Sequence, residues 1–274
     1  MDLQPELAIA SGLLKETSIS AKFFKNLGDL IIKKSSRLIS LDRFMTEYLL
    51  KRGASVTRIS EIPVWPVSEG FYDGNRNVNP FRVKNNYGSK IVIMFSGNHA
   101  HVHPLDTLLK TAKKLRNDER FLFSFVGGGV RKKEVTLYKS KHQLKNIVQH
   151  EFQPRSSFHI SIAASDIQVV VLGEGQVGFT HPNKVYGAMF LGKPILYIGP
   201  SSSHVADILN QLENNVMVRH DEVDLLVSQL LLFANLSEDQ VTTLGRNNLE
   251  YAKQHFSPDY LLDKMVDAVE SSKL

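Results

Sequence analysis

The chain has 274 residues, of which 42% are hydrophobic and 22% charged, a balance typical of one or two folded domains with a sizeable core. It contains no cysteine, which excludes disulfides, thiolate metal sites and a cysteine nucleophile. The net charge of +5 suits an anionic small ligand, an anionic membrane surface or nucleic acid, so the positions of the charges must decide. No apolar run approaches the roughly 18 residues of a membrane span, and the N-terminus lacks a signal-peptide pattern, so we expect a cytoplasmic protein.

Residues 1–63 predict a small, incomplete α/β unit. They contain a helix near residues 20–35, a strand at 37–41, a helix at 42–53 and a strand at 56–63. One or two βα units cannot cover both faces of a sheet by themselves. We therefore expect this segment to be the remnant of a larger domain.

The helix expected at residues 21–34 is amphipathic, with lysines opposite a set of large apolar side chains. The apolar set is Phe23, Phe24, Leu27, Leu30 and Ile31. We favour ordinary core packing of this face over membrane-surface binding, so that any membrane contact is peripheral, at the inner face of the membrane. The next segment, residues 64–88, is rich in glycine, proline and asparagine and predicts a linker.

From residue 89 to residue 220, six strand-like runs alternate with helix-like runs. This alternation predicts an α/β domain with a Rossmann-like, doubly wound parallel sheet. The expected strands cover residues 90–97, 121–128, 146–152, 167–174, 194–200 and 215–220, and the expected helices cover 105–117, 131–142, 156–165, 183–192 and 204–214. Residues 221–274 have helical spacing throughout and predict C-terminal helices.

Three polar loops, residues 96–106, 126–134 and 173–184, follow strands of this sheet at the edge where doubly wound sheets bind ligands. The second, "VGGGVRKKE", favours a phosphate cradle, because glycines let the backbone approach an anion and cations follow at a helix start. The alternative is structural, because glycine-rich turns between a strand and a helix also occur where they only allow the chain to turn. Convergence of all three loops points to an anionic ligand with hydroxyl groups. The residues expected to contact it are Gly97, Asn98, His103, Gly128, Arg131, Lys132, Glu174, His181, Asn183 and Lys184.

The alternating histidines His99, His101 and His103 also invite a metal interpretation. They follow a glycine and precede a proline, so a loop is favoured over a strand, and no cysteine or carboxylate set accompanies them. We expect phosphate or sugar contacts, or structural roles, and no metal. Glu174 has two readings, a partner or base for a sugar hydroxyl and a solvated loop carboxylate.

A second group of lysines lies on the helix after the glycine-rich loop and beyond it. Lys139, Lys141 and Lys145 favour a solvated helix face over a nucleic-acid patch, because no arginine or aromatic residue interleaves them. We therefore expect no nucleic-acid partner.

Four separated motifs carry a resemblance to a known family. They are "ISLDRFMTEYLLKRGA", "MFSGNHAHVHPLDTLLKTAKKL", "FSFVGGG" and "HPNKVYGAMFLGKPILYIGPSSSHVADIL". Together they resemble the GT-B glycosyltransferases of family 4, especially those of exopolysaccharide and colanic-acid synthesis. The resemblance implies two Rossmann-like domains across a cleft, of which the C-terminal one binds a nucleoside diphosphate sugar such as a UDP-sugar. It further implies transfer with retention to a glycan or lipid-linked acceptor, without a metal or other cofactor.

The resemblance also implies roles for individual residues. Lys184 would lie against the diphosphate and stabilise the charge that develops on the leaving nucleotide, as the catalytic cation. Its pattern "HP-x-K-x-Y" includes His181 and Tyr186, and the segment "SGNH" would lie under the phosphates. Phe152 and the loop after it would border the base.

Two departures from the family pattern matter. Asn98 and His103 stand where many members have cations, and Phe179 and Gly187 stand where many have glutamates. The start, "MDLQPELA", resembles a stretch well inside the family's N-terminal domain, so most of the acceptor half is expected to be absent. A non-catalytic nucleotide-sugar-binding subunit, or a truncated enzyme that needs a partner chain, is therefore the alternative function; a non-hydrolysing sugar-nucleotide epimerase is a third. We expect residues 1–63 to mediate a homodimer or to bind a separate acceptor-domain chain.

Overall fold

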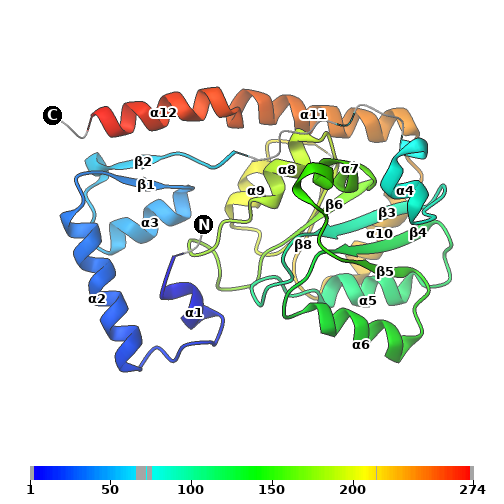
Figure 1. Cartoon of the computed structure of the whole chain (residues 1–274), viewed down its shortest axis with the longest axis horizontal. Helices are drawn as coiled ribbons and strands as arrows, with labels where there is room; N and C mark the ends of the chain where they lie inside the picture. Colours follow the sequence, from blue (N-terminus) through cyan, green and yellow to red (C-terminus); the bar gives the residue numbers. More distant parts are fainter. Residues whose placement is uncertain (1–2, 66–71, 73–75, 214, 272–274) are drawn as a thin grey trace.

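The structure is a computed structural model, which describes residues 3–65, 72, 76–213 and 215–271. Its main element is a six-stranded, wholly parallel sheet in the order β5-β4-β3-β6-β7-β8 (Figure 1). The strands are β3 (Ile91–Ser96), β4 (Phe121–Val126), β5 (Ile147–His150), β6 (Ile167–Val171), β7 (Ile195–Ile198) and β8 (Val216–Val218). The predicted α/β class and doubly wound sheet are confirmed.

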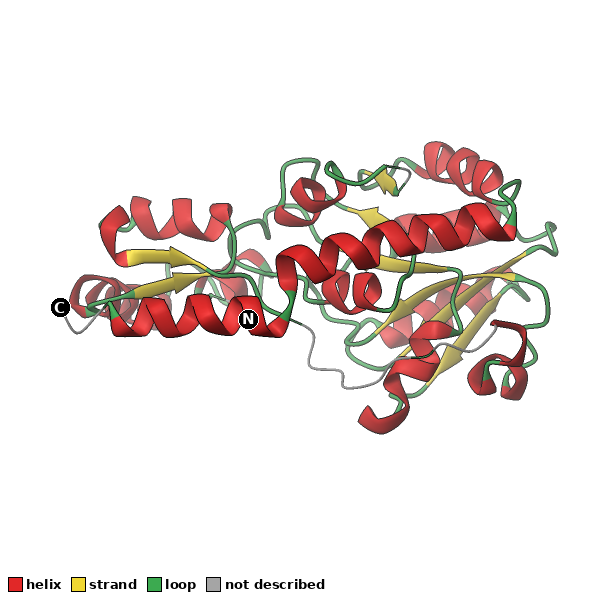
Figure 2. Ribbon diagram, turned by 90° about the horizontal axis from the view of Figure 1, so that it is seen from above, coloured by secondary structure: helices red, strands yellow, loops and turns green. Residues whose placement is uncertain are grey.

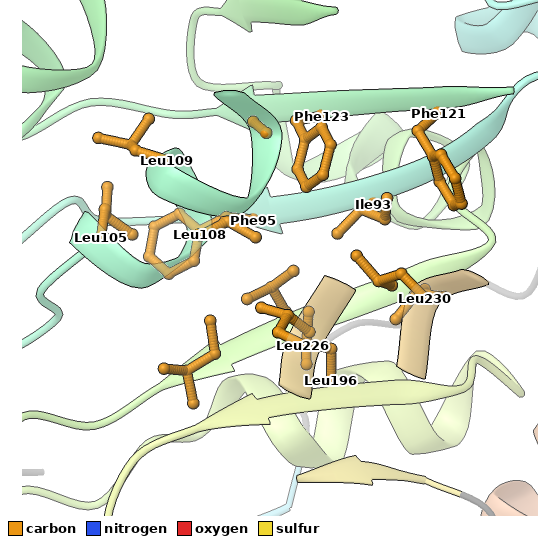
Figure 3. Packing of buried hydrophobic residues seen from close by; sticks show 14 of the residues in the cluster. Ile93, Phe95, Leu105, Leu108, Leu109, Phe121, Phe123, Leu196, Leu226 and Leu230 are labelled. Carbon is orange, nitrogen blue, oxygen red and sulfur yellow. The ribbon is translucent and has the colours of Figure 1, made fainter. Parts of the chain in front are cut away.

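Helices cover both faces of this sheet. One face is covered by α5 (Asp106–Lys114), α6 (Lys132–His142) and α10 (Val223–Phe233), and the other by α4 (Pro80–Lys84), α7 (Phe158–Ala163), α8 (Lys184–Phe190), α9 (His204–Leu209) and α11 (Glu238–Phe256). Because side chains alternate along a strand, Ile93 and Phe95 of β3 pack beneath α5 and α10, whereas Val92 and Met94 face α4 and α7. Figure 3 shows the first of these cores, with Leu226 and Leu230 of α10 packed against the strands.

Part of the predicted linker belongs to the main domain. Residues 66–71 and 73–75 lie outside the described residues, but Pro80–Lys84 form α4. Arg82 is 1% exposed and forms an ion pair with the equally buried Asp166, with Nη1 3.1 Å from Oδ2. Phe81 and Tyr87 join the core under α7. The linker prediction is therefore wrong for residues 76–88. Helix α4 is too short to show a helical periodicity in the sequence, and a buried ion pair and two aromatic rings hold it in place.

The predicted boundary at residue 220 is not a structural boundary either. Leu226, Leu230 and Phe233 of α10 are part of the main core, so this helix is a layer of the six-stranded domain. The last helix, α12 (Pro258–Glu270), continues from α11 across to the N-terminal unit, where Arg37 donates to the carbonyl and hydroxyl of Ser271 (Figure 1).

The N-terminal unit is a two-stranded parallel sheet with helices on either side (Figure 2). Its elements are α1 (Glu6–Ala10), α2 (Ile19–Lys34), β1 (Leu38–Ser40), α3 (Arg43–Lys51) and β2 (Ile59–Glu61). The predicted helix and strand order is confirmed. Three short 3-10 turns, Val56–Arg58, Arg76–Val78 and Arg155–Ser157, complete the described elements.

The expected burial of the apolar face of α2 is wrong. In the described structure its side chains are exposed: Phe23 61%, Phe24 50%, Leu27 41%, Leu30 52% and Ile31 54%. Only Ala21 and Ile32, on the opposite side, are buried, Ile32 against Leu49 of α3. Two strands are too few to cover a 16-residue helix on both sides. We call the five exposed side chains the α2 apolar face.

No helix in the described part of the chain combines the length and hydrophobicity that a membrane crossing requires.

Candidate functional site

The candidate site lies where the strand order reverses. The chain moves outward from β3 to β4 and β5, then returns so that β6 pairs with the other side of β3. The loops after β3 and β6 therefore leave the same sheet edge, at the position where doubly wound sheets form their ligand crevice. The glycine-rich loop after β4 lies beside the first of these.

The loops after β3 and β4 touch through their backbones. Gly127 has φ +124°, and a Cβ there would lie 2.1 Å from the carbonyl oxygen of Gly97. Gly129 has φ +130°, and a Cβ there would lie 2.4 Å from Oδ1 of Asn98. The amide of His99 donates to the Gly128 carbonyl at 2.7 Å. Glycine is required here by both backbone angle and contact distance, so these turns form a glycine cradle in which the two loops are in backbone contact.

Lys184, the first residue of α8, reaches into this cradle. Its Nζ lies 3.7 Å from the ring centroid of Phe95 and donates to the carbonyl of Asn98 at 3.3 Å. A Cβ at Gly97 would approach the lysine Cε to 2.9 Å, so the glycine makes room for the lysine. No carboxylate in the described part of the chain lies within ion-pair distance of this ammonium. Burial lowers the pKa of Lys184 to about 7.

Two of the three histidines in the first loop are buried and hydrogen-bond to backbone carbonyls. His99 is fully buried, and its Nδ1 donates to the carbonyl of Gly97 at 3.0 Å. His103 donates from Nδ1 to the carbonyl of Val171 at 2.7 Å, and burial lowers its pKa to about 3. Burial thus favours the neutral imidazole of His103. His101 is exposed, so the three rings do not share a face.

The second loop and the segment after β5 together offer an aromatic platform more than a cation cluster. Phe152 is 60% exposed, and its ring edge would be 3.0 Å from a Cβ at Gly128. Arg131 is engaged by Glu134 at 2.7 Å, and Nζ of Lys132 lies 2.6 Å from the exposed carboxylate of Glu151. An aromatic face beside a glycine suits stacking of a base.

The third loop divides into an open part and a buried part. Glu174 and Asn183 are exposed, and Asn183 immediately precedes Lys184. His181 and Tyr186 are 3% and 1% exposed and hydrogen-bond to each other at 2.8 Å. The structure thus brings Gly97, Asn98, Gly128, Phe152 and Lys184 together at this edge of the sheet, whereas His181 and Tyr186 are buried. A direct donor contact by any of these residues stays a prediction.

Sequence reasoning missed Phe95, Asp42 and His204. Phe95 is one of several aromatic strand residues, and nothing local marks it as the ring under a lysine. Asp42 is the N-cap of α3, a recognisable signal, but its contact with His181 joins residues 139 positions apart. His204 packs its ring on that of His181, with centroids 3.9 Å apart.

A cavity of about 720 Å³ lies at the opposite, amino end of the strands. Its cations are engaged: Arg76 pairs with Asp166, Arg120 pairs with Asp118, and Lys90 donates to the carbonyl of Glu119. A parallel sheet binds ligands at its carboxyl edge, and Lys184, which has no carboxylate partner in the described part of the chain, lies there. We therefore place the candidate site at Lys184.

The chain resembles known glycosyltransferases in sequence and in fold. No protein-family model matches it. It is 24% identical over 210 residues to the probable glycosyltransferase WbjE of Pseudomonas aeruginosa, with 77% of this chain and 52% of that protein covered. The chain thus spans about half the length of this curated relative.

Solved structures of glycosyltransferases share the fold. Anabaena Alr3699/HepE, in complex with UDP and glucose, aligns with a TM-score of 0.77 at 12% identity, over 91% of this chain and 67% of that one. An S. aureus TarM variant, bound to Fondaparinux, alpha-GlcNAc-glycerol and UDP, gives 0.72 at 13% identity, over 93% and 48%. WaaG, a glycosyltransferase involved in lipopolysaccharide biosynthesis, gives 0.70 at 15% identity, over 97% and 72%. The chain therefore has an α/β fold that matches these GT-B glycosyltransferases.

Proposed function

We propose that this chain binds a nucleoside diphosphate sugar and serves a retaining glycosyl transfer of the family 4 type, in the synthesis of a cell-surface polysaccharide. The observation that carries the proposal is Lys184, which has no carboxylate partner among the described residues and lies over Phe95 beside the glycine cradle. The similarity to WbjE and to UDP-bound structures supports a nucleoside diphosphate as the anion.

The residues of the crevice would divide the work of donor binding. Lys184 would approach the diphosphate and stabilise the negative charge that appears on the leaving nucleotide as the glycosidic bond breaks. Backbone groups of Gly97 and Asn98 would line the phosphates, and Phe152 would stack on the base. Glu174 and Asn183, both exposed in the third loop, remain proposed partners of donor hydroxyls.

A non-catalytic or truncated donor-binding subunit is the second proposal. It is favoured by the N-terminal unit, which has two strands and leaves the α2 apolar face exposed. In this form a glycan or lipid-linked acceptor would be bound with the help of a partner chain. The test is sugar transfer from UDP-glucose or hydrolysis of it by the isolated chain, compared with donor binding alone.

A thermal-shift screen tests the shared element of both proposals. UDP, GDP, dTDP and ADP, and their glucose conjugates, should include at least one compound that raises the unfolding midpoint, because a ligand bound only by the folded state stabilises it by mass action. If none of them changes the midpoint and calorimetry detects no binding, the proposal is wrong.

Diphosphate binding should take up a proton at pH 8. The pKa of Lys184 is lowered from 10.5 to about 7, so the free lysine is charged below pH 7 and largely neutral at pH 8. A bound diphosphate favours the charged form and must restore the proton. UDP affinity should therefore fall as pH rises through 7. Calorimetry at pH 8 in two buffers of different ionisation enthalpy measures this uptake, and its persistence in Lys184→Ala would assign the proton to another group.

Donor binding should survive a chelator. His99 and His103 each donate Nδ1 to a backbone carbonyl, and His101 is exposed, so the loop histidines do not converge as a ligand set. We expect the same UDP affinity with and without EDTA. A loss in EDTA that one divalent metal restores would contradict this.

We further propose that the α2 apolar face mediates a homodimer or the docking of a separate acceptor-domain chain. Light scattering of the purified chain should then give a mass above that of one chain, and the double change Phe23→Ser with Leu30→Ser should return it to a monomer. Leu137→Ser is the matched control, because Leu137 is 60% exposed on α6. A monomeric unmodified chain would refute self-association.

A further inference from the structure

The N-terminal unit and the six-stranded domain meet at a buried group of four side chains, Asp42, His181, Tyr186 and His204, which we call the joint cluster. Asp42 comes from the start of α3, His181 from the loop after β6, Tyr186 from α8 and His204 from the start of α9. All four are less than 9% exposed. Oδ2 of Asp42 lies 2.7 Å from Nδ1 of His181, and Nε2 of His181 lies 2.8 Å from the hydroxyl of Tyr186.

The chemistry of these groups fixes the direction of both hydrogen bonds. The pKa of Asp42 is held below its usual range, because hydrogen bonds from His181 and from the Met45 amide outweigh the effect of burial. The ionised carboxylate only accepts, so Nδ1 of His181 must carry the proton. In the neutral imidazole Nε2 is then an acceptor, and the hydroxyl of Tyr186 donates to it. Asp42 thus sets the tautomer that Tyr186 requires.

A cation site is the competing interpretation of this cluster. Asp42, His181 and His204 can each present a ligand atom, and these atoms lie within 4.8 Å of one another. However, the two imidazole rings are stacked, with centroids 3.9 Å apart and planes inclined by 15°. Their in-plane lone pairs lie in nearly parallel planes and do not converge on one point, and both nitrogens of His181 are already hydrogen-bonded. The geometry favours a hydrogen-bonded relay.

The relay leads directly to the start of α8. Lys184 is the first residue of this helix, and Tyr186 lies in the same turn. The hydrogen bond between His181 and Tyr186 holds His181, which lies three residues before Lys184, against the first turn of α8. The N-terminal unit holds the same loop further upstream, where the Leu3 amide donates to the Phe179 carbonyl at 2.9 Å. The direction in which α8 leaves the loop therefore depends on contacts from the N-terminal unit.

We propose that Asp42 is a positioning residue for donor binding. Through His181 and Tyr186 it fixes the first turn of α8 and holds Lys184 over Phe95, so the N-terminal unit sets the affinity of the chain for a diphosphate. This inference rests on the proposed function. It assigns the buried His181 and Tyr186 a role in donor binding without direct contact.

The test uses two variants that break the relay at opposite ends. Asp42→Ser keeps an N-cap oxygen for α3 but is too short to reach His181, and Tyr186→Phe removes only the hydroxyl. Each should weaken UDP binding by about five- to tenfold, the ratio that corresponds to one hydrogen bond, and leave uridine binding unchanged. The double variant should be no weaker than either single one, because the two groups act through one histidine.

A matched control lies next to Asp42. Arg43 forms an ion pair with Asp207, with Nε 2.6 Å from Oδ2, and so joins the same two elements, α3 and α9, at an exposed position. Arg43→Ser should leave UDP affinity within about twofold of the unmodified chain, as exposed ion pairs contribute little. An equal loss in Arg43→Ser and Asp42→Ser would show general loosening of the joint and would overturn the relay.

A spectroscopic readout separates positioning from simple packing. The ¹⁵N shifts of His181 should report the Nδ1–H tautomer in the unmodified chain and a different or mixed state in Asp42→Ser. An Nε2–H tautomer in the unmodified chain overturns the relay. UDP binding that Asp42→Ser leaves unchanged overturns the positioning role while the proposed function stands, whereas an unmodified chain that binds no diphosphate overturns both.

Discussion

Replacement of Lys184 by alanine is expected to weaken UDP binding by about 1–3 kcal/mol, roughly five- to 150-fold, because a charge-assisted contact to the diphosphate is lost. The lysine has no carboxylate partner among the described residues, and its pKa is lowered by burial. Its removal therefore leaves no stranded acid and should not cost stability. Titration calorimetry with UDP gives the affinity, and urea denaturation gives the stability.

Uridine is the internal control for this result. It offers the base and ribose without phosphates, so its binding should be the same for Lys184→Ala and for the unmodified chain. The ring of Phe152, exposed beside Gly128, should support uridine in both. If both ligands weaken equally, Lys184 is not a phosphate group's partner and the variant has altered the crevice as a whole.

The change Gly127→Ala should lower the free energy of unfolding by about 3 kcal/mol or more. Two costs combine. The φ of +124° is strained for any residue with a Cβ, and that Cβ would lie 2.1 Å from the backbone carbonyl of Gly97, which cannot rotate away like a side chain. The loops after β3 and β4 must separate, so UDP affinity should fall with stability. The midpoint of urea denaturation measures the loss of stability.

Gly187→Ala is the matched control. This glycine lies inside α8 with nothing within 4 Å of a Cβ position, so alanine should raise stability by about 0.5–1 kcal/mol through its higher helix propensity. A Gly127→Ala chain as stable as the unmodified one would mean that the two loops are not in backbone contact.

The sequence predicted the fold of the main domain well because its signals are local. Each strand of the sheet is a short apolar run bounded by turn residues, and alternation within β3 and β4 sends neighbouring side chains to opposite cores. The cradle was predictable for the same reason. Glycines and a lysine at strand ends are visible in the sequence, and sheet topology brings strand ends together.

Other features depend on contacts that no local pattern contains. The burial of α4 depends on the ion pair between Arg82 and Asp166, 84 positions apart. The neutrality of His103 follows from burial beside β6, and its position in the sequence suggested a polar contact. Whether the α2 apolar face is buried depends on how many strands lie beside the helix, and periodicity alone does not reveal that number.

Hydrogen exchange with and without UDP tests the central claim most directly, because it reports the location of binding as well as its occurrence. If the donor lies in the crevice, UDP should slow exchange in peptides that cover residues 96–103, 127–132 and 181–185. Peptides that line the cavity at the opposite sheet edge, residues 86–91 and 233–241, should be unchanged. Protection of those peptides without protection of the three loops would contradict the assignment of the site to Lys184.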